Sequence, residues 1–419
     1  MVVSSPGTSS GAKREPCSID LGQMGPKVPR RARASPPDHS DGGPYGRRSI
    51  FSATVSATGP ITRVKFGDLD LRDPFFESLV ADYQEFPQWF SRKRDSEAWV
   101  LQEDGKLLAF LYLKPEQGAL DDISPHRPAA PRLKAGTLKV DAHGTRLGER
   151  FIKLILDEAL RLAVEEVYVT VFPKHDVLVD LLVRWGFEKA GIKATDNGVE
   201  DVYLRKMAWT GRGIHKDYPF IQIHGVRKHL LSILPRFHTR LFPDSKLNTE
   251  SGDVLANVAH TNSILKIYIS WSEAAKALRP GDVVVIYRMK DENRPSAWYS
   301  SVATSVCVVD KVVPSREFTS EADFVRRCSA YSVFSEEELR EFWRGKRHRL
   351  TAIRMTYNFA LPKRPNRKAL IEQARLDGKE RWTLLPLTDP QFETILALGH
   401  ADERLAIDQA RVRREDPER

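Results

Sequence analysis

The sequence predicts an α+β protein, with a mixed sheet and flanking helices in its first half and a β-barrel with helical insertions in its second. Two observations predict the first half. Asp104-Gly105 separates two apolar strand-like runs, as in a β-hairpin. Another apolar run ends at Val140, before a glycine-containing turn and an amphipathic stretch. The second half is predicted from repeated runs of Val, Ile, Thr and Tyr, which are typical of strands.

The 419 residues are enough for two or three domains. The N-terminal segment is rich in Pro, Gly and Ser and has few large apolar residues. Such a segment buries too little surface to offset its ordering entropy, so we expect a disordered tail. Its basic "RRAR" suggests either a weak nucleic-acid tether or a solvated tail without a role. The expected divisions are a tail over 1–60, a first domain over 61–208, a linker over 209–217, a second domain over 218–398 and a charged tail over 399–419.

Periodicity predicts the elements of the first domain in order. We expect strands at 61–66, 98–103, 106–113, 136–140, 164–172 and 201–207, with a further strand opening at "GF" (186–187). We expect helices at 73–94, broken at Pro87, and at 147–163 and 176–185. Residues 115–133 are expected to form a loop.

In the second domain, four runs rich in β-branched residues predict the strands of a mostly antiparallel barrel: 263–270, 282–289, 301–313 and 350–361. Helical patterns lie between them at 272–278 and 320–345.

Composition limits the function classes. The net charge of +9 and the pI near 9.3 favour polyanionic partners only modestly. The three cysteines form no CxxC pair, so no disulfide framework or metal site is expected. That cysteine usage favours a reducing cytoplasm. The sequence lacks the apolar run of about 18 residues that a membrane span requires.

The joint "LKVDAHGTRLGERFI" (138–152) can bind a phosphate. The first N–H groups of a helix have no internal partner, and the helix dipole adds positive charge there. Gly144 and Gly148 would let a phosphate approach the backbone, and Arg146 adds a cation. A glycine pair before a helix is also common turn chemistry, so both interpretations stay open.

Three stretches together resemble the GNAT superfamily of acyl-CoA-dependent N-acyltransferases. "VLQEDGKLLAFLYL" is similar to its paired central strands. "LKVDAHGTRLGERFIKLILDEAL" is similar to its pyrophosphate-binding strand–loop–helix. "VYVTVFPKHDVLVDLLVRWGFEKAG" is similar to the strand that splays away, with the helix and the "GF" that follow. The resemblance covers about residues 61–208 and implies acetyl-CoA, or another acyl-CoA, as the acyl donor.

The family loop reads Arg/Gln-x-x-Gly-x-Gly/Ala, whereas this chain has His143 at the first position, Arg146 at the fourth and Gly148 at the last. The resemblance implies that the pyrophosphate is bound by Val140, His143, Gly144, Thr145, Arg146, Leu147, Gly148 and Glu149. The Tyr that often protonates the leaving thiolate is replaced by Leu182.

Three side chains are the candidate catalytic groups. His175 is the nearest substitute for the missing acid, because imidazole titrates near neutrality. It could equally border a helix at the surface. Asp141 and His143 follow the strand and could act as bases through water, although an N-capping role for Asp141 is also plausible.

The second half carries a long basic stretch. Residues 342–368 have no Asp or Glu, and Phe342, Trp343, Tyr357 and Phe359 are interleaved with nine basic residues. Basic residues neutralise phosphates and aromatic rings stack on bases, although a buried core with a solvated face gives the same pattern. The predicted nucleic-acid-binding residues are Arg344, Lys346, Arg347, Arg349, Arg354, Lys363, Arg364, Arg367 and Lys368, with Arg227 and Lys228 from the second basic stretch at 224–240.

"ILKIYISWSEAAKALRPGDVVVIYRM" resembles PUA-like modules of the ASCH type, which are small β-barrels associated with RNA. The pairing with a GNAT-like half is similar to uncharacterised bacterial proteins. The leading hypothesis is an N-acyltransferase with an RNA-binding module, acting on an amine of RNA, aminoacyl-tRNA or a protein. The alternatives are a non-catalytic RNA-binding or regulatory protein with a degenerate GNAT fold, and a small-molecule N-acyltransferase with an unrelated module. The oligomeric state is left open.

Overall fold

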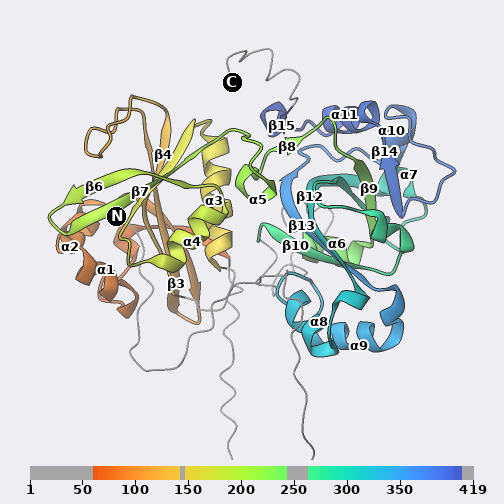
Figure 1. The fold of residues 1–419 in the computed structure, drawn as a ribbon, viewed down its shortest axis with the longest axis horizontal. Coiled ribbons are helices and arrows are strands. Elements are labelled where there is room, and N and C mark those ends of the chain that lie inside the picture. Colours follow the sequence, from red (N-terminus) through yellow and green to blue (C-terminus); the bar gives the residue numbers. More distant parts are fainter. Residues whose placement is uncertain (1–59, 142–146, 243–262, 408–419) are drawn as a thin grey trace, which may run out of the picture. The chain divides into compact units, whose positions relative to one another are not determined.

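The computed structural model describes residues 60–141, 147–242 and 263–407. Within these ranges it is a mixed α+β protein built on two main sheets (Figure 1). The predicted N-terminal tail and most of the predicted C-terminal tail lie outside the described residues. No helix in the described ranges combines the length and apolar character needed to cross a bilayer.

The first half forms a seven-stranded sheet in the order β1-β2-β3-β4-β5-β7-β6. Only β4 and β5 run parallel among its neighbouring strands. The strands are β1 (Ile61–Lys65), β2 (Glu97–Glu103), β3 (Lys106–Glu116), β4 (Arg132–Val140), β5 (Glu166–Val171), β6 (Glu188–Thr195) and β7 (Gly198–Lys206). The helices are α1 (Glu77–Asp82), α2 (Phe86–Arg92), α3 (Leu147–Arg161) and α4 (Asp176–Arg184).

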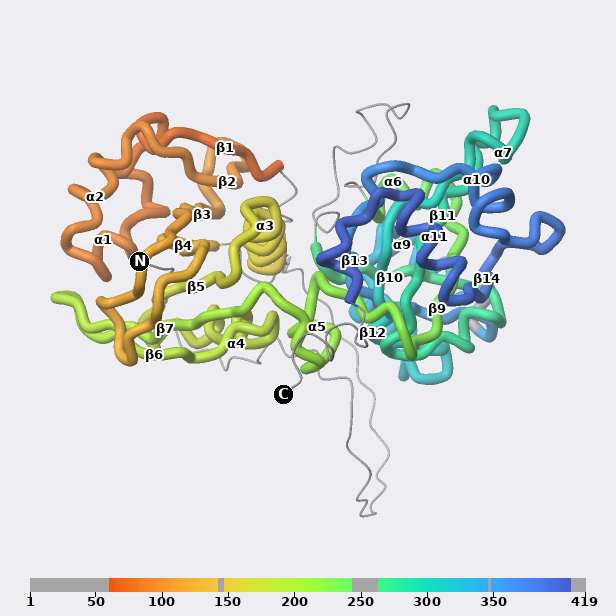
Figure 2. Tube along the Cα trace, turned by 90° about the horizontal axis from the view of Figure 1, so that it is seen from above, coloured from red at the N-terminus to blue at the C-terminus, as the bar shows by residue number. Residues whose placement is uncertain are grey.

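The helices cover both faces of this sheet. Phe76, Phe86 and Phe90, from the segment that holds α1 and α2, pack against Phe110 of β3. On the other face the apolar stripe of α3 packs on β3, β4 and β5. In Figure 2, β3, β4 and β5 run between α1–α2 and α3. The expected order of elements is therefore found, and the predicted Asp104-Gly105 turn joins β2 to β3.

Two expected boundaries were wrong. The helix expected at 73–94 does not break at Pro87. It breaks between α1 and α2, and Pro87 lies in the first turn of α2, where a missing N–H costs nothing. The strand expected at 136–140 begins earlier, at Arg132. The charge of Arg132 suggested a loop, but its side chain is buried and its backbone is part of the sheet.

The second half forms a six-stranded sheet in the order β10-β13-β12-β11-β9-β14. Four of its five strand pairs are antiparallel, as expected, and β11–β9 is parallel. The strands are β9 (Lys228–Ile233), β10 (Leu265–Ser270), β11 (Val283–Arg288), β12 (Val302–Pro314), β13 (Thr351–Ala360) and β14 (Leu384–Leu387). In the described ranges β10 and β14 form the edges and no pairing joins them, so the expected barrel is not confirmed.

Helices and short strands complete this half. The helix expected at 272–278 is a 3₁₀ helix over Glu273–Ala277, and the helical pattern at 320–345 divides into two helices. The helices are α5 (Ile214–Asp217), α6 (Pro235–Leu241), α7 (Ala297–Ser300), α8 (Glu321–Cys328), α9 (Glu336–Lys346), α10 (Arg367–Glu372) and α11 (Asp389–Leu398). A further parallel pair joins β8 (Ile221–Gln222) to β15 (Ala406–Ile407).

Candidate functional site

The parallel strands β4 and β5 separate before either strand ends. Their pairing runs from Arg132–Glu166 to Ala135–Val169. Beyond that point β4 continues to Val140 along β3, while β5 continues to Val171 along β7. We call this opening the β4–β5 splay. It exposes strand edges inside the sheet, where a ligand can reach backbone groups.

A β-bulge lies at the base of the splay. β3 pairs Leu113 with Ala135 and Tyr112 with Thr137, so Gly136 is an extra residue on β4. A bulged residue is left out of the ladder, and its backbone groups are available to another partner. A Cβ atom on Gly136 would lie 3.0 Å from Tyr112 Cδ1, which explains the glycine. The adjoining Thr137 Oγ1 is fully buried and makes no hydrogen bond within the described residues.

A pocket of about 240 Å³ lies on the α1–α2 face of this sheet, and Gly136 is part of its wall. Its volume is below the roughly 300–1,000 Å³ of sites for drug-sized ligands, so it suits a small molecule or a single side chain. Its walls combine aromatic rings, carboxylates and lysines. The lining residues are Tyr83, Glu85, Trp89, Lys93, Tyr112, Lys114, Glu116, Lys134, Gly136, Lys193, Thr195, Asn197 and Glu200.

Two glutamates of the pocket accept hydrogen bonds from tyrosines. Tyr83 Oη donates to Glu200 Oε1 at 2.7 Å, and Glu200 is buried. Tyr168 Oη donates to Glu116 Oε2 at 2.5 Å, and Lys114 Nζ lies 2.7 Å from Glu116 Oε1. Burial raises the pKa of Glu116, but these two hydrogen bonds together lower it below its usual value. Glu116 is thus held ionised by neighbours that leave it little basicity.

The predicted base Asp141 lies just past the end of β4, where its N–H bonds to Leu108 O. Its Oδ1 atom is 3.7 Å from Nζ of Lys139, a buried lysine that also donates to Phe75 O and Ser78 Oγ. Burial lowers the pKa of Lys139, and the Asp141 charge opposes that shift. Residues 142–146, between Asp141 and the first described residue of α3, lie outside the described residues, so the capping role of Asp141 stays a prediction.

His175, the other described catalytic candidate, directly precedes α4. Its imidazole is 9% exposed, and Nε2 lies 3.3 Å from Asp82 Oδ2 without hydrogen-bond geometry. Burial lowers the pKa of His175, Asp82 opposes the shift and Lys174 adds to it. Its side chain is not part of the pocket lining. His175 thus borders a helix, as one of the two interpretations had it, but its side chain is largely buried and not at the surface, and its catalytic role stays a prediction.

Much of the predicted pyrophosphate loop lies outside the described residues, namely His143, Gly144, Thr145 and Arg146. Val140 is half-buried at the end of β4, and Leu147 and Glu149 are buried in the first turn of α3. A Cβ atom on Gly148 would lie 2.8 Å from Leu181 Cδ2 of α4. The glycine is therefore explained by the close packing of α3 on α4. Leu182, at the position of the family tyrosine, is 1% exposed and belongs to the core.

Three basic residues of 342–368 pair with acids that lie outside this stretch. Arg344 pairs with Glu321 at 2.7 Å, Arg354 pairs with Asp310, and Lys368 Nζ lies 3.9 Å from Glu372. Arg367 stacks on Trp382 at 3.8 Å, and Arg364 is half-buried. Arg349 and Lys363 are exposed, while nothing is described of the side chains of Lys346 and Arg347.

The aromatic residues of this stretch are mostly core. Trp343, Tyr357 and Phe359 are each less than 9% exposed. Phe342 packs on Trp271 and Phe334. Trp343, Tyr357 and Phe359 are thus covered by protein and are not free to stack on bases, whereas Phe342 is half-buried.

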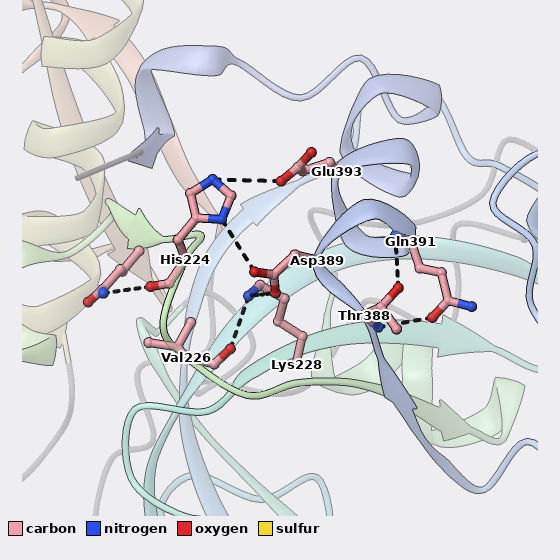
Figure 3. Close-up of polar contacts among 8 residues, drawn as sticks. His224, Val226, Lys228, Thr388, Asp389, Gln391 and Glu393 are labelled. Carbon is pink, nitrogen blue, oxygen red and sulfur yellow. Dashed lines mark hydrogen bonds and ion pairs between the residues drawn. The ribbon is translucent and has the colours of Figure 1, made fainter. Parts of the chain in front are cut away.

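The two predicted nucleic-acid contacts in the earlier basic stretch are also paired. Arg227 binds Asp282 through Nε at 2.9 Å and Nη2 at 2.5 Å. Lys228 is 2% exposed, and its Nζ lies 2.6 Å from Asp389 Oδ1 and 3.0 Å from Val226 O. Figure 3 shows Asp389 between Lys228 and His224, whose Nδ1 is 3.3 Å away. Lys228 therefore ties β9 to the start of α11.

The pocket was missed at the sequence level. Its lining comes from α2, β3, β4, β6, β7 and the turns beside them, between residues 83 and 200, and no local motif links them. The sequence holds one weak signal: in "LYLKPE", at the end of β3, Tyr, Lys and Glu alternate with Leu, Leu and Pro, which is typical of a strand with one solvated face.

No family model matches this chain, and no curated protein matches it. Solved structures do show similarity. An acyl-CoA N-acyltransferase from Pseudomonas aeruginosa is 22% identical and covers 35% of this chain and 99% of its own, with a TM-score of 0.25. The NatC complex bound to Gag peptide and CoA gives 16% identity over 34% and 96%, with a TM-score of 0.24. The ZmASCH protein from Zymomonas mobilis, as a mutant, gives 13% identity over 41% and 95%, with a TM-score of 0.27. With TM-scores below 0.5, these likenesses carry no functional argument, and we reason from the chain's own residues.

Proposed function

We propose that this protein is an acyl-CoA-dependent N-acyltransferase of the GNAT type, with acetyl as the acyl group and the acceptor amine held in the pocket. The observation that carries the proposal is the β4–β5 splay, which opens beside a pocket that shares Gly136 with the bulge. A thioester lying in the splay would place its carbonyl near the unpaired backbone of the bulge. The amine would approach from the pocket. Val140 and residues 143–149 stay the proposed pyrophosphate contacts.

The chemistry requires a base and an oxyanion donor. As the amine nitrogen forms its bond to the carbonyl carbon, the carbon–sulfur bond breaks and a proton leaves the nitrogen. The backbone N–H at the bulge is suited to stabilise the developing oxyanion. Glu200 is the base that the pocket favours, because it is buried and carries one hydrogen bond from Tyr83. Asp141 and His143 stay alternative bases and His175 stays the proposed acid, although neither Asp141 nor His175 lines the pocket.

Calorimetry with acetyl-CoA, followed by an amine panel assayed for free thiol, tests this proposal. We expect binding, and turnover that Glu200→Gln lowers by about 10²–10⁴-fold, since it removes the base but keeps an acceptor for Tyr83. Glu165→Gln is the control, because Glu165 is exposed and is not part of the pocket lining. Absence of acetyl-CoA binding by the wild-type protein would overturn the proposal.

A second candidate function is a regulator or RNA-binding protein with a degenerate GNAT fold. The buried Leu182 favours it, because a side chain with no acid group fills the position where the family protonates the thiolate. Binding of acetyl-CoA without turnover of any amine would support this candidate. An RNA-binding, PUA-like second half and a cytoplasmic location belong to both versions as proposals, with RNA or aminoacyl-tRNA as the partner.

A further inference from the structure

Within the described residues, two of the four lysines that line the pocket form ion pairs and two do not. Lys114 pairs with Glu116, and Lys193 Nζ lies 2.5 Å from Asp122 Oδ2. Lys134 and Lys93 also line the pocket, yet within the described residues neither makes an ion pair. Each instead lies over a tyrosine ring, Lys134 Nζ 5.3 Å from the centroid of Tyr168 and Lys93 Nζ 5.3 Å from that of Tyr112.

The ammonium group of Lys134 lies in an electrostatically unfavourable position. Lys134 stands directly opposite Lys114 in the β3–β4 register, and like charges in that arrangement repel. Burial lowers the pKa of Lys134, and the charge of Lys193 lowers it further. The charges of Glu116, Asp122 and Glu200 oppose this shift, but none of these carboxylates forms an ion pair with Lys134, so they replace only part of the lost hydration. An anion bound in the pocket would remove that cost.

The same pocket contains two glutamates without a cation. Glu200 accepts from Tyr83, and Glu85 accepts from Asn197 Nδ2 at 2.8 Å. Neither forms an ion pair with Lys134 or Lys93, so these two carboxylates and these two ammonium groups line one small cavity without direct contact. A ligand carrying one charge of each sign can be neutralised at both ends in such a cavity.

We propose that the acceptor is a small zwitterionic amine, whose anionic group binds Lys134 and whose ammonium group faces Glu200. This inference rests on the proposed function and names its substrate class. The anionic group is a carboxylate or a phosphate monoester, as in an α-amino acid or an amino-alkyl phosphate. Trp89 and Tyr112 supply apolar walls for the remaining atoms.

The test compares amines that differ only in the anion. Phenylalanine is assayed beside its methyl ester, and phosphoethanolamine beside ethanolamine, each with acetyl-CoA. We expect kcat/KM about 10- to 100-fold higher for the anionic member of one pair, which also identifies the anion. Lys134→Gln should abolish that preference and Lys134→Arg should retain part of it. The exposed Lys106→Gln is the control.

The outcomes separate the inference from the proposed function. Equal rates for both members of each pair would overturn the inference and leave the acyltransfer intact. If no amine is acylated, calorimetry of the same four amines without acetyl-CoA tests the zwitterion site by itself. If the wild-type protein binds an anionic amine and Lys134→Gln does not, the zwitterion site is supported and the acyltransfer is not. No binding of either anionic amine to the wild-type protein overturns it.

Discussion

Gly148 shows how one residue can satisfy two different explanations. In the sequence, the lack of a side chain suggested that a phosphate could approach the backbone. In the structure, a Cβ atom at this position would contact Leu181. We expect Gly148→Ala to leave the unfolding free energy within about 1 kcal/mol, because the helix propensity gained offsets a small shift of the Leu181 tip. Acetyl-CoA affinity should change by less than about threefold.

The matched variant is Gly148→Leu, which overpacks the α3–α4 contact and should cost about 1–3 kcal/mol in chemical unfolding. A large loss of acetyl-CoA affinity in Gly148→Ala, with unchanged stability, would show that the backbone there faces the phosphate after all.

We expect His238 of α6 to make the protein less stable in mild acid. Its ring is fully buried, Nε2 lies 2.8 Å from Thr304 Oγ1, and burial, with the charges of Arg288 and Arg364, lowers its pKa to about 3. The unfolded chain takes up this proton below about pH 6.5, whereas the folded chain does not until about pH 3. The destabilising contribution of His238 is therefore absent well above pH 6.5 and grows as the pH drops through that window.

We expect the wild-type protein to lose roughly 2 kcal/mol more than His238→Gln between pH 6.5 and pH 5. Urea unfolding across this range measures the difference. Parallel pH profiles for the two proteins would contradict the assignment.

At the scale of elements, Arg132 organises the segment between β3 and β4. It is 2% exposed, and its guanidinium donates to Glu166 at 2.7 Å, to Gly118 O at 3.0 Å and to Pro128 O at 2.7 Å. Arg132→Met should cost about 3–5 kcal/mol, because it leaves the mostly buried Glu166 without its cation. Arg132→Lys keeps the charge but not the planar fork, so we expect a smaller loss.

Limited proteolysis checks this role separately from global stability. Cleavage within 117–131 should become faster in both variants, and faster in Met than in Lys. Unchanged cleavage together with lowered stability would mean that Arg132 supports the sheet alone.

Strands with clear apolar patterns were predictable, and one central strand was not. β9 was interpreted as part of a basic stretch, although Leu230, Leu231 and Ile233 are buried in it. The misleading residue is Lys228, whose charge is neutralised by Asp389, 161 residues away in the sequence. A sequence pattern around Lys228 therefore cannot reveal that its charge is neutralised. The β4–β5 opening was predicted through the family resemblance, but the bulge at Gly136 depends on register with β3 and was not.

At the scale of the molecule, the net charge of +9 overstates the cations available to nucleic acid. Three of the predicted contacts in 342–368 pair with acids from elsewhere. If all nine basic residues bound phosphates, the logarithm of RNA affinity would fall with the logarithm of salt with a slope near −6. We expect a slope no steeper than about −2, measured by fluorescence anisotropy with single-stranded RNA.

A slope near −6 would mean that RNA displaces the intramolecular pairs. Arg349→Gln with Lys363→Gln should flatten the slope most, since both residues are exposed. Arg344→Gln, which removes a paired residue, is the comparison.

The contact between Asp122 and Lys193 has a consequence for how this protein could diversify. Asp122 lies in the segment between β3 and β4, and its side chain is 61% exposed, yet it neutralises a lysine of the pocket wall. The same segment bridges to β6 through Ser124 and Ile192. A neutral residue at 122 would release Lys193 and add a further uncompensated cation to the pocket without altering any core residue. Substrate charge preference could thus drift through surface substitutions, while the sheet that supports the chemistry stays unchanged.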